Sequence, residues 1–235
     1  MPRFIHHAYA LAFGGYLRRP VQQDFEARAC CVLPSVGGRA ASRSEGFRLT
    51  DRASGRILIA CDSAESSIAA SQDGQGERRT VLRAVVRGLN VLDVLRVDEV
   101  IAALTVVHRT NRTVSMDTGG SRVAGLKLEG KPLEIKLDHA LGRDASDYDE
   151  FRRKHPELPE STGVTRHSLA QHPSLKFDPW EPGYVDVSDF GRVYFCEWWA
   201  APKRQGLIML RLRLGSPAEG EIEVGALEAD GHDYP

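Results

Sequence analysis

The chain has 235 residues, a length that fits one large domain or at most two small ones. It carries 31 lysine and arginine residues against 32 aspartate and glutamate residues, so its formal net charge is −1. This balance argues against a dedicated nucleic-acid-binding protein, which normally has a basic excess, and against an acidic disordered chain. Hydrophobic residues make up 42% of the chain, which is enough for a buried core. We therefore expect a globular protein without a nucleic-acid partner.

Neither a membrane span nor a secretion signal is expected from the sequence. No run of about 18 apolar residues occurs. A signal peptide needs a continuous apolar run of about 7–15 residues, and two histidines interrupt the short apolar patch at the start of the chain. The cysteines form no C-x-x-C pair, which disfavours a zinc knuckle. We expect a cytoplasmic protein with four reduced thiols, which are Cys30, Cys31, Cys61 and Cys196.

Alternation of large with small or polar side chains dominates the first third of the chain and is typical of β-strands. The first strand has a face of large residues and a face that contains His6 and three alanines. Later in this region, Leu82, Ala84 and Val86 are predicted to point inward. The predicted strands are residues 5–13, 25–33, 47–49 and 57–61, the last two flanking a turn at 51–55, followed by a long strand after a surface loop at 70–79.

Residues 94–107 are compatible with two structures. One subset of their apolar residues keeps helical spacing, and another keeps strand spacing. The richness of the segment in valine, isoleucine and threonine favours a strand. Further along, apolar pairs on both sides of Gly130 and Lys131 predict a tight hairpin.

The segment 143–182 differs from the rest and is predicted to be a helix plus an irregular insertion. Ser146 can cap a helix over 146–155, with acidic residues near its start and basic residues near its end, and Pro156 stops it. The last third of the chain predicts a meander of strands at 184–187, 193–199, 207–214 and 222–227, with a solvated tail over 228–235.

These elements together predict a mainly β fold. We expect a single domain over residues 1–235, a sandwich or a barrel-like structure of about ten strands, with one short helix near 146–155. The regular spacing of the predicted strands and turns is the basis of this prediction.

A weak internal repeat is visible at an offset of 37 residues. Residues 86–91 and 123–128 both read V-x-G-L-x-[VL], which we interpret as a duplicated strand–turn unit, because a solenoid needs at least three copies. The run RGLNVLDVLRVDEVIAALTVVH, the run SRVAGLKLEGKPLEIKLD and the opening RFIHHAYA resemble a family of bacterial proteins of unknown function. The repeat units are also similar to modules of choice-of-anchor surface proteins. The resemblance extends best over residues 80–138 and implies β-rich structure and a surface or assembly role, with no catalytic residues.

No sequence motif indicates an active site. His6 and His7 are adjacent in a predicted strand and point to opposite faces, so they cannot share a metal ion, and only one could act with a distant partner such as His108, His139 or His167. A hydrogen-bonded core histidine beside an exposed one is the favoured interpretation. Residues 189–191 copy the kinase tripeptide Asp-Phe-Gly, but the other kinase motifs are absent and a hairpin turn is favoured. We expect neither a metal nor another cofactor.

An aromatic strand near the end of the chain supplies the candidate binding residues. Strand alternation places Tyr194 and Trp198 on one face and Phe195 and Trp199 on the other, so one face can fill the core while the other holds a ligand or a partner. Both faces could instead be covered within the chain. The candidate binding residues are Tyr194, Trp198 and Trp199.

The sequence favours a non-catalytic structural or interaction protein that forms a homo-oligomer or a larger assembly. The near-zero net charge, the many strands and the absence of an active-site motif support this hypothesis. The alternative is a small-molecule-binding protein or a hydrolase-like enzyme, with its site in a barrel mouth near the histidines.

Overall fold

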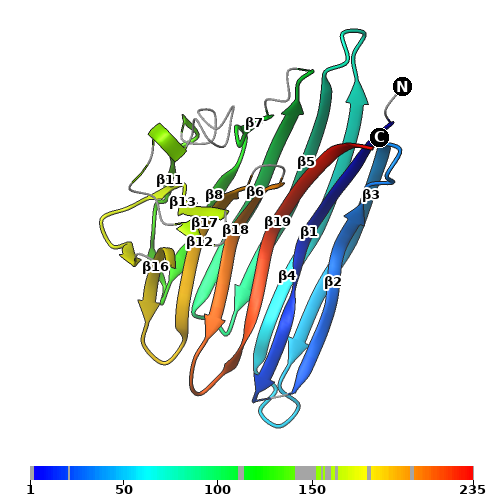
Figure 1. The fold of residues 1–235 in the computed structure, drawn as a ribbon. Coiled ribbons are helices and arrows are strands. Elements are labelled where there is room, and N and C mark those ends of the chain that lie inside the picture. The colour runs from blue at the N-terminus through cyan, green and yellow to red at the C-terminus, as the bar shows by residue number, and fades with distance from the viewer. Residues whose placement is uncertain are drawn as a thin grey trace.

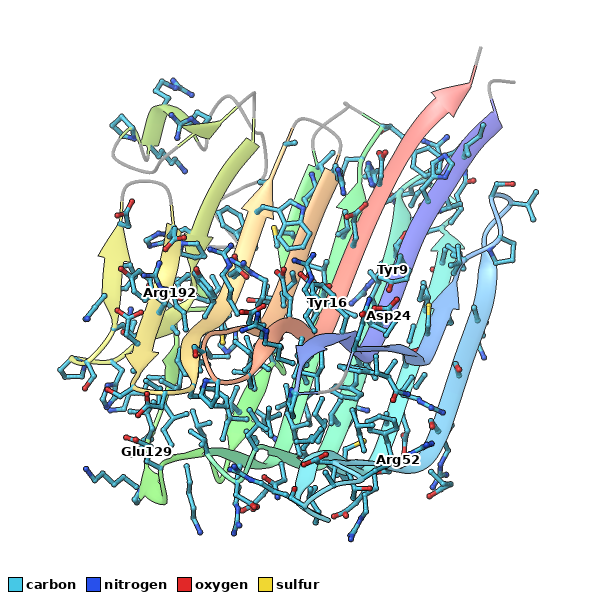
Figure 2. All side chains as sticks on the ribbon, turned by 90° about the horizontal axis from the view of Figure 1, so that it is seen from below. Tyr9, Tyr16, Asp24, Arg52, Glu129 and Arg192 are labelled. Atoms are coloured by element: carbon cyan, nitrogen blue, oxygen red, sulfur yellow. The ribbon has the colours of Figure 1, made fainter. Side chains whose placement is uncertain are left out.

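The computed structural model consists of two antiparallel β-sheets that lie face to face (Figure 1). Strands account for 72% of the structure and helix for 2%, so the predicted mainly β sandwich is confirmed. Figure 2, a view from below, shows side chains of both sheets filling the space between them. The structure describes residues 3–20, 22–110, 114–140, 152–154, 156, 160–161, 164–178, 181–201 and 204–234.

The first sheet, here called sheet A, joins the two ends of the chain. Its strand order is β12-β13-β17-β18-β19-β1-β2, with β16 paired to β17 and β15 to β16. Because β19 pairs with β1 from Tyr234 opposite Arg3 onward, the termini lie side by side (Figure 1). Residues 228–234 of the tail predicted over 228–235 are part of strand β19, and residue 235 lies outside the described residues. The strands are β1 (Arg3–Arg19), β2 (Gln23–Val32), β12 (Glu160–Ser161), β13 (Val164–Ser168), β15 (Lys176–Asp178), β16 (Glu181–Val187), β17 (Gly191–Ala200), β18 (Arg204–Leu214) and β19 (Glu219–Tyr234).

The second sheet, here called sheet B, is built from the middle of the chain. Its order is β10-β9-β6-β5-β4-β3, with β7 and β8 also paired to β6. A two-stranded sheet of β11 (Lys136–Leu137) and β14 (Ala170–Gln171) completes the fold. The strands of sheet B are β3 (Gly38–Thr50), β4 (Ile57–Gln72), β5 (Arg78–Val91), β6 (Leu95–His108), β7 (Val114–Asp117), β8 (Arg122–Ala124), β9 (Lys127–Leu128) and β10 (Lys131–Pro132).

Most of the predicted elements are present. The ambiguous segment 94–107 is the strand β6, as its residue types favour, and the hairpin at Gly130 joins β9 to β10. Residues 152–154 are helical, while the rest of the predicted helix 146–155 lies outside the described residues. No helix in the described part of the chain is long and apolar enough to cross a membrane.

A row of residues across each sheet reverses which side chains point inward. In β5, Leu82, Ala84 and Val86 are buried before the row, and Leu89 and Val91 after it, so the parity of the inward positions changes. In sheet B the residues that the pairing register places on this row are Gly46, Asp62, Gly88, Asp98 and Gly125. In sheet A they are Ala29, Ala12, Gly225, Met209 and Cys196.

In every second strand of each sheet, the residue that lies on this row adopts a left-handed backbone conformation. Gly88 and Gly125 have φ values of 62° and 65°, and Ala29 and Cys196 have values of 49° and 52°. Such a residue in a strand breaks the regular pleat, as in a β-bulge. Gly88 and Gly125 are the glycines of the two V-x-G-L-x-[VL] units. The repeated glycine therefore lies on this row of residues, and not in the turn of a strand–turn unit as interpreted from the sequence.

We predict that Gly88→Ala lowers the free energy of unfolding by about 1–3 kcal/mol, because the residue is left-handed and a Cβ atom would overlap the Asp62 carboxylate. The matched control is Gly74→Ala, since Gly74 has no positive φ and open space around it. The control is expected to stay within about 0.5 kcal/mol of the wild type. Urea unfolding measures both variants, and equal stabilities would contradict the role of the row.

Candidate functional site

The aromatic strand β17 divides its side chains between the core and the outer face of sheet A. Trp198 is fully buried between the sheets, where its indole N–H donates to the sulfur of Met116 in sheet B, and Phe195 belongs to the same core. Tyr194 and Trp199 point to the outer face. The predictions that Tyr194 shares a face with Trp198 and that Phe195 shares a face with Trp199 are therefore wrong, because the left-handed Cys196 reverses the alternation.

Tyr194 is fully buried although it lies on the outer face. The guanidinium carbon of Arg211 lies 3.9 Å from the centre of its ring, and that of Arg213 lies 5.5 Å away. Its hydroxyl donates to Glu181 at 3.1 Å, and burial raises the pKa of the phenol. Arginine side chains thus cover this ring within the chain.

Trp199 remains half-buried beside a glycine of the next strand. It pairs with Gly206 of β18, and a Cβ atom at Gly206 would overlap the indole ring. The missing side chain therefore provides the space in which the indole lies flat on the sheet. Of the three candidate binding residues, Trp199 is the one that combines aromatic area with partial exposure.

A buried ion pair crosses the outer face next to Trp199. Glu197 receives two hydrogen bonds from Arg211, one of them at 2.7 Å, and their side chains are only 8% and 13% exposed. Arg211 also approaches Glu221 at 3.6 Å. A two-point contact of this kind fixes both side chains in one geometry. Farther along the sheet, Arg192, labelled in Figure 2, pairs with Asp186 at 2.9 Å.

A cavity of about 270 Å³ lies between Trp199 and this ion pair. Among its lining residues are Arg204, Ile208, Glu221 and Glu223. Arg204 is held by Glu228 at 2.6 Å. Burial raises the pKa of Glu223 above its usual value, and the neighbouring Glu221 carboxylate raises it further. The cavity therefore combines an aromatic wall, an apolar residue and a carboxyl group that is costly to ionise.

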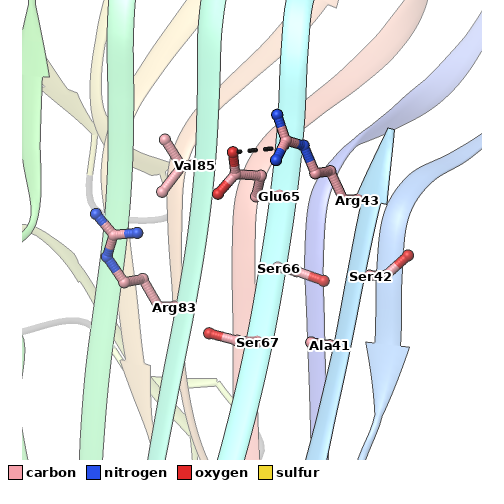
Figure 3. A pocket seen from close by; sticks show the side chains of 8 residues that line it. All are labelled: Ala41, Ser42, Arg43, Glu65, Ser66, Ser67, Arg83 and Val85. Atoms are coloured by element: carbon pink, nitrogen blue, oxygen red, sulfur yellow. Dashed lines mark ion pairs between the residues drawn. The ribbon is translucent and has the colours of Figure 1, made fainter. Parts of the chain in front are cut away.

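The outer face of sheet B holds a second, shallower depression, of about 300 Å³ (Figure 3). Arg43 of β3 and Arg83 of β5 flank β4, where Ser67 and Glu65 lie, and Arg43 approaches Glu65 at 3.9 Å. This depression borders β3, which pairs with β4 on one side and has no second ladder partner among the described residues. β2 of the other sheet packs against β3, and its Cys31 thiol donates to the Ala40 carbonyl at 3.9 Å.

The two histidines of β1 lie on opposite faces, as predicted. His6 is buried, with Nδ1 at 3.5 Å from the Thr80 hydroxyl, whereas His7 is exposed. Burial lowers the pKa of His6, and the charge of Arg78 lowers it further. Within the described part of the chain, no three metal-ligating side chains converge.

The comparisons with known proteins identify one family. A family model described as a domain of unknown function, DUF8256, matches residues 4–177. No curated protein and no solved structure matches the chain. The strands β17, β18 and β19, which carry the cavity, follow the matched segment, although β19 pairs with β1 inside it.

We predict that Glu223→Gln raises the midpoint of thermal unfolding at pH 7. A carboxyl group whose pKa is raised in the folded state costs stability once it ionises, and glutamine removes that cost. Below about pH 4 the wild-type carboxyl is largely protonated, so the two proteins should unfold at the same temperature there. Calorimetry at both pH values tests this, and a variant that is less stable at pH 7 would contradict the assigned pKa direction.

Proposed function

The chain belongs to the DUF8256 family of domains of unknown function, and we propose that it is a non-catalytic interaction protein that assembles with itself. The observation that supports this is the open edge of β3. The likeness of its repeat units to choice-of-anchor modules, which implies an assembly role, points the same way. The cysteines are free thiols, which fits the cytoplasmic compartment expected from the sequence.

An open edge strand offers unpaired backbone N–H and C=O groups to another chain. β3 is 13 residues long, and in the described structure β4 is its one neighbour in the sheet. Gly46 belongs to the left-handed row, with φ 30°, and interrupts the regular pleat. Residues 38–45 are therefore the straight part of this edge, on which a second strand could form a ladder. Within it the Ala40 carbonyl already accepts a long hydrogen bond, 3.9 Å, from the Cys31 thiol of β2, which an added strand would have to displace or share.

The charges of this straight segment favour one antiparallel register with a second copy. Centring the pair on Ser42 places Arg39 opposite Glu45 of the second copy, twice by symmetry, in addition to the ion pair that Glu45 makes with Arg43 of its own chain at 2.7 Å. Moving the centre by one residue, to position 41 or 43, places Arg39 or Arg43 opposite Arg43 of the second copy. Opposite charges across a ladder stabilise it and like charges destabilise it. The register centred on Ser42 is the one that we propose.

The aromatic strand offers less support for an interface than β3 does. Trp198 is fully buried in the core, and Tyr194 is covered by arginines of the same chain. The large apolar residues that stay exposed in the described structure are few and scattered, namely Val32, Val36, Val81 and Phe177. Self-association through an apolar patch on the C-terminal meander is therefore not the arrangement that we propose.

We predict that Glu45→Arg weakens the dimer by about tenfold or more, because it replaces two opposite-charge pairs with two like-charge pairs. The charge-swapped double variant, Arg39→Glu with Glu45→Arg, should restore the dimer. Light scattering over a concentration series measures each dissociation constant. A wild-type chain that stays monomeric at high concentration, or a double variant as weak as Glu45→Arg, would overturn the proposed register.

We also predict that Ser42→Cys forms a disulfide between two copies under mild oxidation, since residue 42 faces itself across the two-fold axis. The background should carry Cys30→Ser, because Cys30 is the one partly exposed thiol. The matched control is Ser67→Cys, an exposed serine of β4 that lies between β3 and β5. Non-reducing gel electrophoresis should show a crosslinked dimer for position 42 and none for position 67.

A further inference from the structure

The cavity on the outer face of sheet A is a candidate ligand site that is separate from the edge proposed for self-association. It lies over β17, β18 and β19, whereas β3 is the edge of the other sheet. Its volume of about 270 Å³ is suited to a small molecule. The chemistry of its lining indicates which class of small molecule fits.

The positive groups of the lining are already committed to other carboxylates. Arg211 is held by Glu197 in a two-point contact and stacks on Tyr194. Arg204 is held by Glu228 at 2.6 Å. Arg211 is fully engaged within the chain, and Arg204, which is 58% exposed, is already paired with Glu228, so the lining disfavours a phosphate or carboxylate ligand.

The negative groups of the lining are in excess. Glu221 has one ion-pair partner among the described residues, Arg211 at 3.6 Å, which is also held by Glu197. Glu223 lies opposite Arg211 in the strand pairing but makes no hydrogen bond or ion pair with the described residues. Burial and Glu221 raise its pKa, while the charge of Arg211 lowers it. A half-buried carboxylate that no cation contacts directly is costly to ionise, and a positively charged ligand group would lower that cost.

The apolar residues of the lining favour an organic cation over a bare metal ion. Trp199 supplies a half-buried indole, and cations bind well over the face of tryptophan. Ile208 provides an apolar surface next to it. The three glutamates of the lining do not converge in the way a metal ion requires.

We propose that this cavity binds a small organic cation, with an ammonium or guanidinium group on Glu223 and Glu221 and an apolar body against Trp199 and Ile208. The charge-assisted hydrogen bonds to the carboxylates orient the ligand, and the indole adds apolar contact with its body. This assigns Glu223 and Glu221 as binding residues for the charged group.

The test is calorimetric titration of the full chain at pH 7.5 with benzylammonium and with benzyl alcohol, its uncharged match. Benzylammonium is expected to bind at one site per chain, and benzyl alcohol at least about tenfold more weakly. Saturable benzylammonium binding that falls about tenfold in Glu223→Gln and in Glu221→Gln supports the site.

The matched control is Glu65→Gln, which removes a carboxylate from the outer face of sheet B and should leave binding unchanged. Thermal unfolding of each variant checks that the fold is retained. Three results would overturn the proposal: no benzylammonium binding to the wild type, equal binding of benzyl alcohol, or wild-type affinity in Glu223→Gln. Each of them leaves the oligomeric state untouched, so self-association is judged separately.

Discussion

The left-handed row across each sheet is the constraint on which the rest of this structure depends. A strand normally alternates inward and outward side chains without interruption. Here each long strand switches, at the same level, from even-numbered to odd-numbered inward positions or the reverse. The switch has to occur in all strands together, because only then do hydrogen-bonded neighbours stay in register. Gly88 and Gly125 meet this requirement without steric cost, whereas Ala29 and Cys196 meet it as residues that rarely adopt a positive φ.

The row also determines which side chains are available for function. In β17, the left-handed Cys196 directs Trp198 into the core and leaves Trp199 on the outer face beside the cavity. In β3, Gly46 ends the straight part of the open edge. The face on which Trp199 lies and the length of the straight segment of β3 thus both depend on the backbone conformation at one level of the sandwich.

The sequence predicts the strands better than it predicts their faces. Alternation locates the strands because the space between two sheets selects apolar residues at every second position. It fails at Cys196, since nothing in a run such as Phe-Cys-Glu-Trp-Trp signals a left-handed residue, and counting by two then assigns Trp198 to the wrong side. The glycines of the internal repeat were a usable signal, because a glycine within an apolar alternating run indicates a bulge.

The candidate site was only partly predictable for a related reason. Trp199 was identified from its residue type, but Glu197 and Glu223 were not, because a carboxylate in a strand ordinarily indicates a solvent-facing position. Their role depends on cross-strand neighbours: β18 contributes Arg211 between Glu197 of β17 and Glu223 of β19. A pattern of arginines on one strand and glutamates on the next becomes informative only when the pairing is known.

The near-neutral net charge reflects outer faces on which a strand rich in one sign of charge lies beside strands that carry the other. On sheet A, glutamates of β19 lie beside arginines of β18, as in the pairs Arg204–Glu228 and Arg211–Glu221. On sheet B, Arg87 of β5 pairs with Glu65 of β4 and Glu99 of β6. Pairing through β3 extends sheet B into sheet B of a second copy and covers neither outer face. The acidic cavity of sheet A would therefore stay open to solvent in the dimer. A protein built in this way can assemble through one sheet while it binds a cation on the other, because the two sites share no residue.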